Sequence, residues 1–118
     1  MPNQPTQLDR VFQALADPTR RAVLQRLSGG AAPVSELARP FDMALPSFLQ
    51  HLRVLEDCGL VRSRKSGRVR TYQISPRPLQ AAEGWMVEQR ARWELRLDQL
   101  DRYLTELKPT KEPNREKK

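Results

Sequence analysis

Apolar residues recur with helical spacing over most of the chain. A first stripe stands at i, i+3, i+4 and i+7 and predicts a short helix: Leu8, Val11, Phe12 and Leu15. Asp17 followed by Pro18 is a favoured helix start, because Asp caps well and Pro is tolerated at the first helical position. A second helix is therefore predicted from Pro18 to about Leu27, ended by the glycine pair 29–30.

Two further helices follow, separated by a turn. Ser35 is predicted to cap a short third helix, which Pro40 interrupts. After a turn at 41–43, a fourth amphipathic helix is marked by Leu45, Phe48, Leu49, Leu52 and Leu55. Gly59 is predicted as the C′ residue of this helix, with Leu60 supplying the hydrophobic contact of that cap. Leu49 is expected in the core.

The period of the pattern then changes from helix to strand. The stretches VRSRK and RVRTYQI contain β-branched and aromatic residues and flank Ser66-Gly67. This pair is interpreted as the two-residue turn of a β-hairpin over about 61–74.

A long final helix is predicted from about Leu79 to Lys108, separated from the hairpin by Pro76 and Pro78. Its apolar residues recur every seven positions, with two more widening the stripe: Leu79, Met86, Trp93, Leu100 and Leu107, then Leu97 and Leu104. At 1.5 Å per residue this helix spans roughly 45 Å, more than a small domain can cover. We therefore predict a symmetric homodimer through this helix, with Leu8, Val11 and Phe12 of the first helix contributing.

These elements predict one mainly α-helical domain with a small β-hairpin, in the order of a winged helix-turn-helix protein. At 118 residues the chain suits a single modest core. We expect a flexible N-terminus over 1–7, a winged helix-turn-helix domain over 8–108 that includes a dimerisation helix over 79–108, and a disordered charged tail over 109–118.

Charge is concentrated in the hairpin. The chain has 21 Lys and Arg against 14 Asp and Glu, a net charge of +7, which favours a polyanionic partner. No acidic residue occurs between Asp57 and Glu83. Six cations fall inside that window: Arg62, Arg64, Lys65, Arg68, Arg70 and Arg77. A merely solvated basic face is the alternative interpretation.

Other residue types exclude several functions. With no signal-like segment and no run of about 20 apolar residues, a cytoplasmic protein without a membrane span is expected. The chain has one histidine, no glycine-rich phosphate loop and no nucleophile–base set, so we predict no enzymatic activity and no cofactor. The single Cys58 cannot form an internal disulfide and is interpreted as a packed side chain, with redox sensing as the alternative.

Several stretches, in this order, closely resemble the ArsR-type family of bacterial transcriptional regulators over about residues 8 to 107. They are FQALADPTRRAVLQRL, VSELA, LPSFLQHLRVLEDCGLV and GRVRTYQI. The resemblance implies a homodimeric DNA-binding repressor for an inverted-repeat operator. Its recognition helix, about 45–58, would enter the major groove, and its basic wing, about 61–74, would lie along the backbone or adjacent minor groove.

The resemblance also assigns DNA-binding residues. It places Pro46, Ser47, Gln50 and His51 near DNA, and Arg53, Arg62, Arg64, Lys65, Arg68 and Arg70 near phosphates or the minor groove. The chain departs from many relatives at Ala44 and Leu49, where they carry hydroxyl residues. It also lacks the cysteines and histidines of the metal-sensing members, so no metal site is predicted.

Some alternatives stay open at this point. The hairpin could instead dock a protein or an RNA. His51 could pack between helices rather than touch DNA, and Trp85 and Trp93 could line a small-molecule pocket rather than a dimer interface. The residues identify no effector, operator sequence or regulated gene, and do not separate repression from activation.

Overall fold

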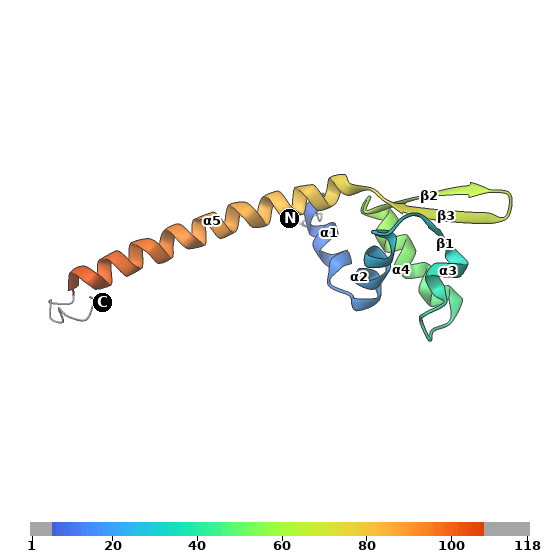
Figure 1. Ribbon diagram of the computed structural model, residues 1–118, viewed down its shortest axis with the longest axis horizontal. Coiled ribbons are helices and arrows are strands. Elements are labelled where there is room, and N and C mark those ends of the chain that lie inside the picture. Colours follow the sequence, from blue (N-terminus) through green and yellow to red (C-terminus); the bar gives the residue numbers. More distant parts are fainter. Residues whose placement is uncertain (1–5, 108–118) are drawn as a thin grey trace, which may run out of the picture. The chain divides into compact units, whose positions relative to one another are not determined.

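The computed structural model describes residues 6–107, which form five helices and a three-stranded sheet (Figure 1). The elements are α1 (Gln7–Leu15), α2 (Pro18–Leu27), β1 (Ala32–Pro33), α3 (Val34–Ala38), α4 (Leu45–Asp57), β2 (Val61–Ser66), β3 (Val69–Ile74) and α5 (Pro76–Leu107). The mainly helical winged helix-turn-helix class is confirmed. The expectations for residues 1–5 and 108–118 lie outside the described residues.

The described residues divide into two compact units. The first runs to Glu83 and holds the four short helices, the sheet and the start of α5, and the second begins at Gly84 and consists of the remaining turns of α5. No helix within residues 6–107 is long and apolar enough to cross a membrane.

Side-chain caps fix where α1 and α2 begin. The Thr6 hydroxyl accepts a hydrogen bond from the Asp9 backbone N–H, and the Asp9 carboxylate accepts one from the Thr6 N–H, a complete capping box. Thr6 and Gln7, expected in a flexible N-terminus, therefore belong to the start of α1. Asp17 caps α2 by accepting from the Arg20 N–H at 3.1 Å, as predicted from Asp17-Pro18.

The core of the first unit is built from one face of each helix and the inner face of the sheet. Its largest fully buried side chains are Val11, Val23, Leu37, Phe48, Leu52, Leu55, Cys58, Leu60 and Val61. Val11 has no exposed surface, so its predicted place in a dimer interface is wrong. It is the inward residue of the α1 stripe, whereas Leu8 and Phe12 are half-buried at the margin of the core.

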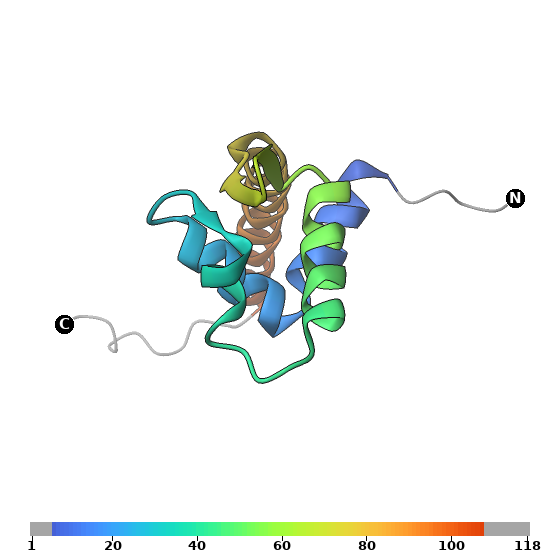
Figure 2. The same ribbon diagram turned by 90° about the vertical axis from the view of Figure 1, so that its right-hand side faces the viewer.

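Figure 2 shows the turn that joins α3 to α4, the two helices of the motif. The predicted Ser35 cap is wrong: α3 begins at Val34, two residues earlier than that cap implies, its N-cap is Pro33, and no side chain caps it. Pro33 is held in the short strand β1, so the chain enters α3 directly from a strand.

The end of α4 follows the prediction. The Leu60 N–H bonds to the Leu55 carbonyl and the Gly59 N–H to the Glu56 carbonyl, both at 3.0 Å, which is the Schellman arrangement. Gly59 has a φ of 83°, the left-handed conformation that this motif requires. Leu60 is fully buried beside the cap.

The sheet contains one strand more than the predicted hairpin. Strand order is β1-β3-β2, and β1 pairs antiparallel with β3 through only two residues, too short for a recognisable strand pattern. Ser66 pairs with Val69, so the two turn residues are Gly67 and Arg68 rather than Ser66 and Gly67. Gly67 has a φ of 64°, as the first central residue of a type II′ turn requires.

Helix α5 starts at Pro76, three residues earlier than predicted. Pro76 and Pro78 lie in its first turn, where the backbone N–H groups have no helical partner and proline is tolerated. The helix has 32 residues and is therefore about 48 Å long. Leu79 and Ala82 pack on the core of the first unit.

Candidate nucleic-acid interface

One side of α4 is available to a ligand. Phe48, Leu52 and Leu55 are buried, and the opposite side exposes Pro46, Ser47, Gln50 and Arg53. The exposed residues are those assigned to DNA from the sequence, with His51 half-buried at their edge. The N-cap residue Ala44 makes no side-chain capping bond. The structure therefore brings a polar row to the surface of the second motif helix.

Leu49 does not join the core as expected. Its side chain is 41% exposed, and Leu45, one turn earlier, is 53% exposed. The reason is the position of Leu49 around the helix axis. Residues four apart lie on the same side of a helix, so Leu45, Leu49 and Arg53 form one row. This row runs beside the buried row of Phe48, Leu52 and Leu55.

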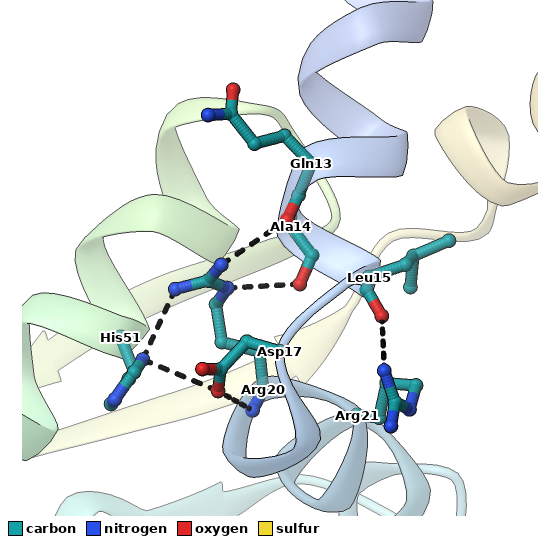
Figure 3. A network of polar contacts seen from close by, with 7 residues as sticks. All are labelled: Gln13, Ala14, Leu15, Asp17, Arg20, Arg21 and His51. Carbon is teal, nitrogen blue, oxygen red and sulfur yellow. Dashed lines mark hydrogen bonds and ion pairs between the residues drawn. The ribbon is translucent and has the colours of Figure 1, made fainter.

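Arg20 ties the exposed helix to the corner between α1 and α2 (Figure 3). Its Nε donates to the Ala14 carbonyl at 2.9 Å and its Nη2 to the Gln13 carbonyl at 3.2 Å. Its Nη1 lies 3.1 Å from Nδ1 of His51 on α4. The last carbonyls of a helix lack helical partners, so Arg20 supplies a donor to the Ala14 carbonyl, while the Gln13 carbonyl also accepts from the Ala16 N–H. Through His51, Arg20 links α1 to α4.

His51 lies between Arg20 and Asp17. Nη1 of Arg20 is a donor, and the role of Nδ1 in the 3.1 Å contact depends on the tautomer of the ring. The same Nδ1 lies 3.7 Å from the Asp17 carboxylate. His51 therefore packs against the corner between α1 and α2, and its assignment to DNA stays a prediction.

Asp17 is held in its charged form by this corner. Burial is the largest single influence and raises its pKa, but the Arg20 backbone N–H and the charges of His51 and Arg20 together outweigh it. The net effect is a pKa lowered from 3.8.

The wing cations are divided between the two faces of the β2–β3 ribbon. Directly opposed residues share a face, so Arg62 opposite Gln73 and Arg64 opposite Thr71 lie on one side. Lys65 lies directly opposite Arg70 on the other side. Arg68 is in the turn.

Arg70 also belongs to a chain of contacts that joins the wing to α4. Its Nη1 donates to the Ser63 hydroxyl at 2.8 Å, and that hydroxyl donates to the Glu56 carboxylate, also at 2.8 Å. Tyr72, opposite Ser63, is buried, and burial followed by the charge of Glu56 raises the pKa of its phenol. The wing is thus fastened to the last turn of α4.

Cys58 follows its predicted place in the core. It is 2% exposed, and burial, the largest influence, raises the pKa of its thiol, so the reactive thiolate is disfavoured. Among residues 6–107, no group of three or more His, Cys, Asp or Glu side chains is arranged to hold a metal ion.

The second unit carries the predicted apolar stripe. Its exposed members are Met86, Trp93, Leu97, Leu100, Leu104 and Leu107, each roughly half exposed or more. Trp93, Leu97 and Leu100 line a concave patch together with Arg92, Arg96 and Tyr103, and Trp85 is not part of it.

Sequence reasoning missed Arg20, Ser63 and Glu56. Each acts through a partner on another element, 31 residues away for the Arg20–His51 contact and 7 for Ser63–Glu56. An arginine on a helix and a serine on a strand carry no pattern that names such a partner.

The helix-turn-helix of α3 and α4, followed by the basic wing, defines a winged helix-turn-helix DNA-binding protein. A helix-turn-helix domain family matches residues 15–64. The chain belongs to the ArsR family of transcriptional regulators. The crystal structure of the ArsR family transcriptional regulator RHA00566 is 61% identical and superposes with a TM-score of 0.73, covering 80% of this chain and 97% of that one.

Curated relatives agree with this family. The HTH-type transcriptional regulator Rv2034 of Mycobacterium tuberculosis is 48% identical over 62% of this chain and 68% of its own. The transcriptional repressor SdpR of Bacillus subtilis is 31% identical over 68% of this chain and 89% of its own. A homodimeric winged helix-turn-helix DNA-binding domain, Mb0332 of Mycobacterium bovis, is 28% identical with a TM-score of 0.58, covering 75% of this chain and 82% of that one.

Proposed function

We propose that the protein is a homodimeric repressor that binds an inverted-repeat operator in the cytoplasm, acting by occupancy of DNA and not by catalysis. In each half-site α4 enters the major groove, and the β2–β3 wing follows the backbone or the adjacent minor groove. Repression is supported by the name of the relative SdpR, and a dimer by the homodimeric neighbour Mb0332.

The observation that carries the proposal is the pairing of Lys65 with Arg70. Like charges directly opposite each other across an antiparallel pair are destabilising. Both residues are exposed, and no acidic residue occurs in the sequence from 58 to 82. Arg70 reaches the Glu56 carboxylate only through the Ser63 hydroxyl, and no ion pair is formed by Lys65 or Arg70 within residues 6–107. A polyanion laid along the wing relieves this repulsion and releases its own condensed counterions.

The exposed side of α4 supplies side chains that can distinguish one base from another. Gln50 can pair bidentately with adenine, and Ser47 can bond to a base or a phosphate. Arg53, exposed one turn after Leu49, supports a phosphate contact by its charge. We infer that the wing cations Arg62, Arg64, Lys65, Arg68 and Arg70 give affinity and register, while Ser47 and Gln50 read sequence. Pro46 fixes the first turn of α4, and His51 positions the helix through Arg20.

The stripe on α5 is the surface for a second copy. A two-fold dimer presents two copies of α4 in opposite directions, so a palindromic site matches its symmetry. The exposed residues proposed for this contact are Met86, Trp93 and Leu100. Half-buried residues at the edge of the core would contribute as well: Leu8, Phe12 and Leu79.

The test is selection of DNA from a random duplex pool by the purified full chain, followed by footprinting. We expect enrichment of an inverted repeat with half-site centres one helical turn, or a multiple of it, apart. A competition with duplex RNA of equal length belongs to the same experiment. If no sequence is enriched and RNA competes as well as DNA, the proposal fails and the docking alternative replaces it.

A further inference from the structure

The large apolar side chains with high exposure in the first unit lie on only two elements, α4 and the wing. Among the described residues up to Glu83, the large apolar side chains with high exposure are Leu45, Leu49 and Val69. The first two lie on α4 and the third on β3 of the wing. The other large apolar residues of this unit are buried or half-buried. Isolated exposed leucines are ordinary, but their confinement to the DNA-facing elements is not.

The two leucines form a short apolar row inside a polar surface. Leu45 and Leu49 are one turn apart on the N-terminal half of α4, the half of a recognition helix that contacts base edges. Gln50 and Arg53, their neighbours on the surface, are both exposed and polar. A ligand that meets this row must therefore offer apolar and polar groups side by side.

The major groove of DNA offers such a combination. Its base edges carry hydrogen-bonding groups and one apolar group, the 5-methyl of thymine. A leucine neither donates nor accepts a hydrogen bond, so against any other base edge it would leave a polar group without a partner. Burial of the methyl against Leu49 removes apolar surface of both from water.

We propose that Leu49, flanked by Leu45, is a specificity-determining residue that contacts the 5-methyl group of a thymine in each operator half-site. This inference rests on the proposed function, because it requires α4 to lie in the major groove. It assigns a base preference to a position where a hydrogen-bonding side chain is absent. A protein partner docked on the same row would not distinguish thymine from uracil.

The experiment removes one symmetry-related pair of methyl groups at a time from the DNA. A duplex is selected from a random pool by the full-length protein and then resynthesised with deoxyuridine replacing each thymine singly, at the symmetry-related positions of both half-sites. Uracil keeps every hydrogen-bonding group of thymine. Affinities of wild type, Leu49→Ala and Leu95→Ala are measured by fluorescence anisotropy. Leu95, on α5 and 58% exposed, is the matched control leucine.

At one thymine per half-site, wild type should bind the deoxyuridine duplex about 15-fold more weakly, about fourfold for each of two methyl groups. Leu49→Ala should bind both duplexes with nearly equal affinity, whereas Leu95→Ala should keep the wild-type ratio. Equal binding of all deoxyuridine duplexes by wild type overturns the inference, as does an unchanged ratio in Leu49→Ala.

Failure of the proposed function looks different. In that case no sequence is enriched in the selection, and the experiment ends before any thymine is replaced. Binding of Leu49→Ala to random duplex at low salt checks that the variant is folded and keeps its phosphate contacts. Loss of that binding means that Leu49 is needed for general affinity, and this also overturns a role confined to thymine.

Discussion

Replacement of Arg64 with alanine separates electrostatic binding by the wing from the stability of the fold. Arg64 is exposed, stands opposite Thr71, and makes no hydrogen bond or ion pair within residues 6–107. The free energy of unfolding should therefore change by no more than about 0.5 kcal/mol. Arg70 would be a poorer choice, since its loss also breaks the contact to Ser63.

The magnitude follows from counterion release. Each phosphate contact contributes about 0.9 to the slope of log affinity against log salt, and a two-fold dimer carries two copies of Arg64. The slope should become shallower by about 1.8. Between 50 and 200 mM salt, the variant should lose about 12-fold less affinity than wild type.

Fluorescence anisotropy on the selected duplex and on a scrambled duplex, across a salt series, measures this slope. Arg102→Ala, on α5, is the control with the same change in charge. Specific and non-specific binding should weaken alike in Arg64→Ala. A slope equal to that of wild type on both duplexes would show that Arg64 meets no phosphate, and would refute the electrostatic reasoning for its face of the wing.

Four further outcomes are expected. Gln50→Ala should cost roughly 1–3 kcal/mol on the selected duplex and relax preference at one base position, with the salt slope unchanged in the same titrations. Sedimentation equilibrium at micromolar concentration should give a dimer mass for wild type and a lower mass for Trp93→Glu, which places a charge on the stripe; a monomeric wild type would exclude the interface. Asp17→Ala should cost about 1 kcal/mol in urea unfolding at pH 7 by loss of its cap. Because the folded pKa of Asp17 lies below 3.8, the part due to its charge is present above that pH and disappears as pH falls through the lowered folded pKa, so the variant and wild type should converge in acid. Zinc, cadmium or arsenite should leave DNA affinity unchanged, since the sequence has one cysteine and one histidine; metal-dependent release would contradict this.

The parts of the fold that were predictable are those specified by neighbours in sequence. Asp17 and Pro18 are sufficient to predict the start of α2, and Gly59 and Leu60 are sufficient to predict the end of α4. The seven-residue stripe of α5 likewise follows from spacing alone. Each of these signals needs only a few adjacent residues and no knowledge of what packs nearby.

The failures share a dependence on distant partners. Ser35 has the chemistry of a cap, but β1 pairs with β3 and brings the chain into α3 two residues earlier. The turn of the hairpin moved by one residue because the register of the whole ribbon decides it. Leu49 was expected in the core and is exposed, whereas Val11 was expected at a dimer interface and is buried. Periodicity identifies an apolar stripe on a helix but does not say which edge of the stripe faces the core.

The candidate site was predictable as a set of residue types and not as a set of contacts. The exposed positions of α4 and the cations of the wing follow from the motif order. The connections from Arg20 to His51 and from Arg70 through Ser63 to Glu56 required coordinates, because a side chain on one element gives no indication of its acceptor on another.

The glycine cap at the end of α4 has a consequence for how new binding preferences can arise. Only Cys58, Gly59 and Leu60 connect α4 to β2, and two of them are buried while the third holds a left-handed turn. The angle and spacing between α4 and the wing are therefore set by this short joint together with the contacts from Arg70 through Ser63 to Glu56. Side chains on the exposed row of α4 can be exchanged without disturbing that joint. A designer could recode the protein for another operator by rewriting a few surface positions, while the frame that presents them stays the same.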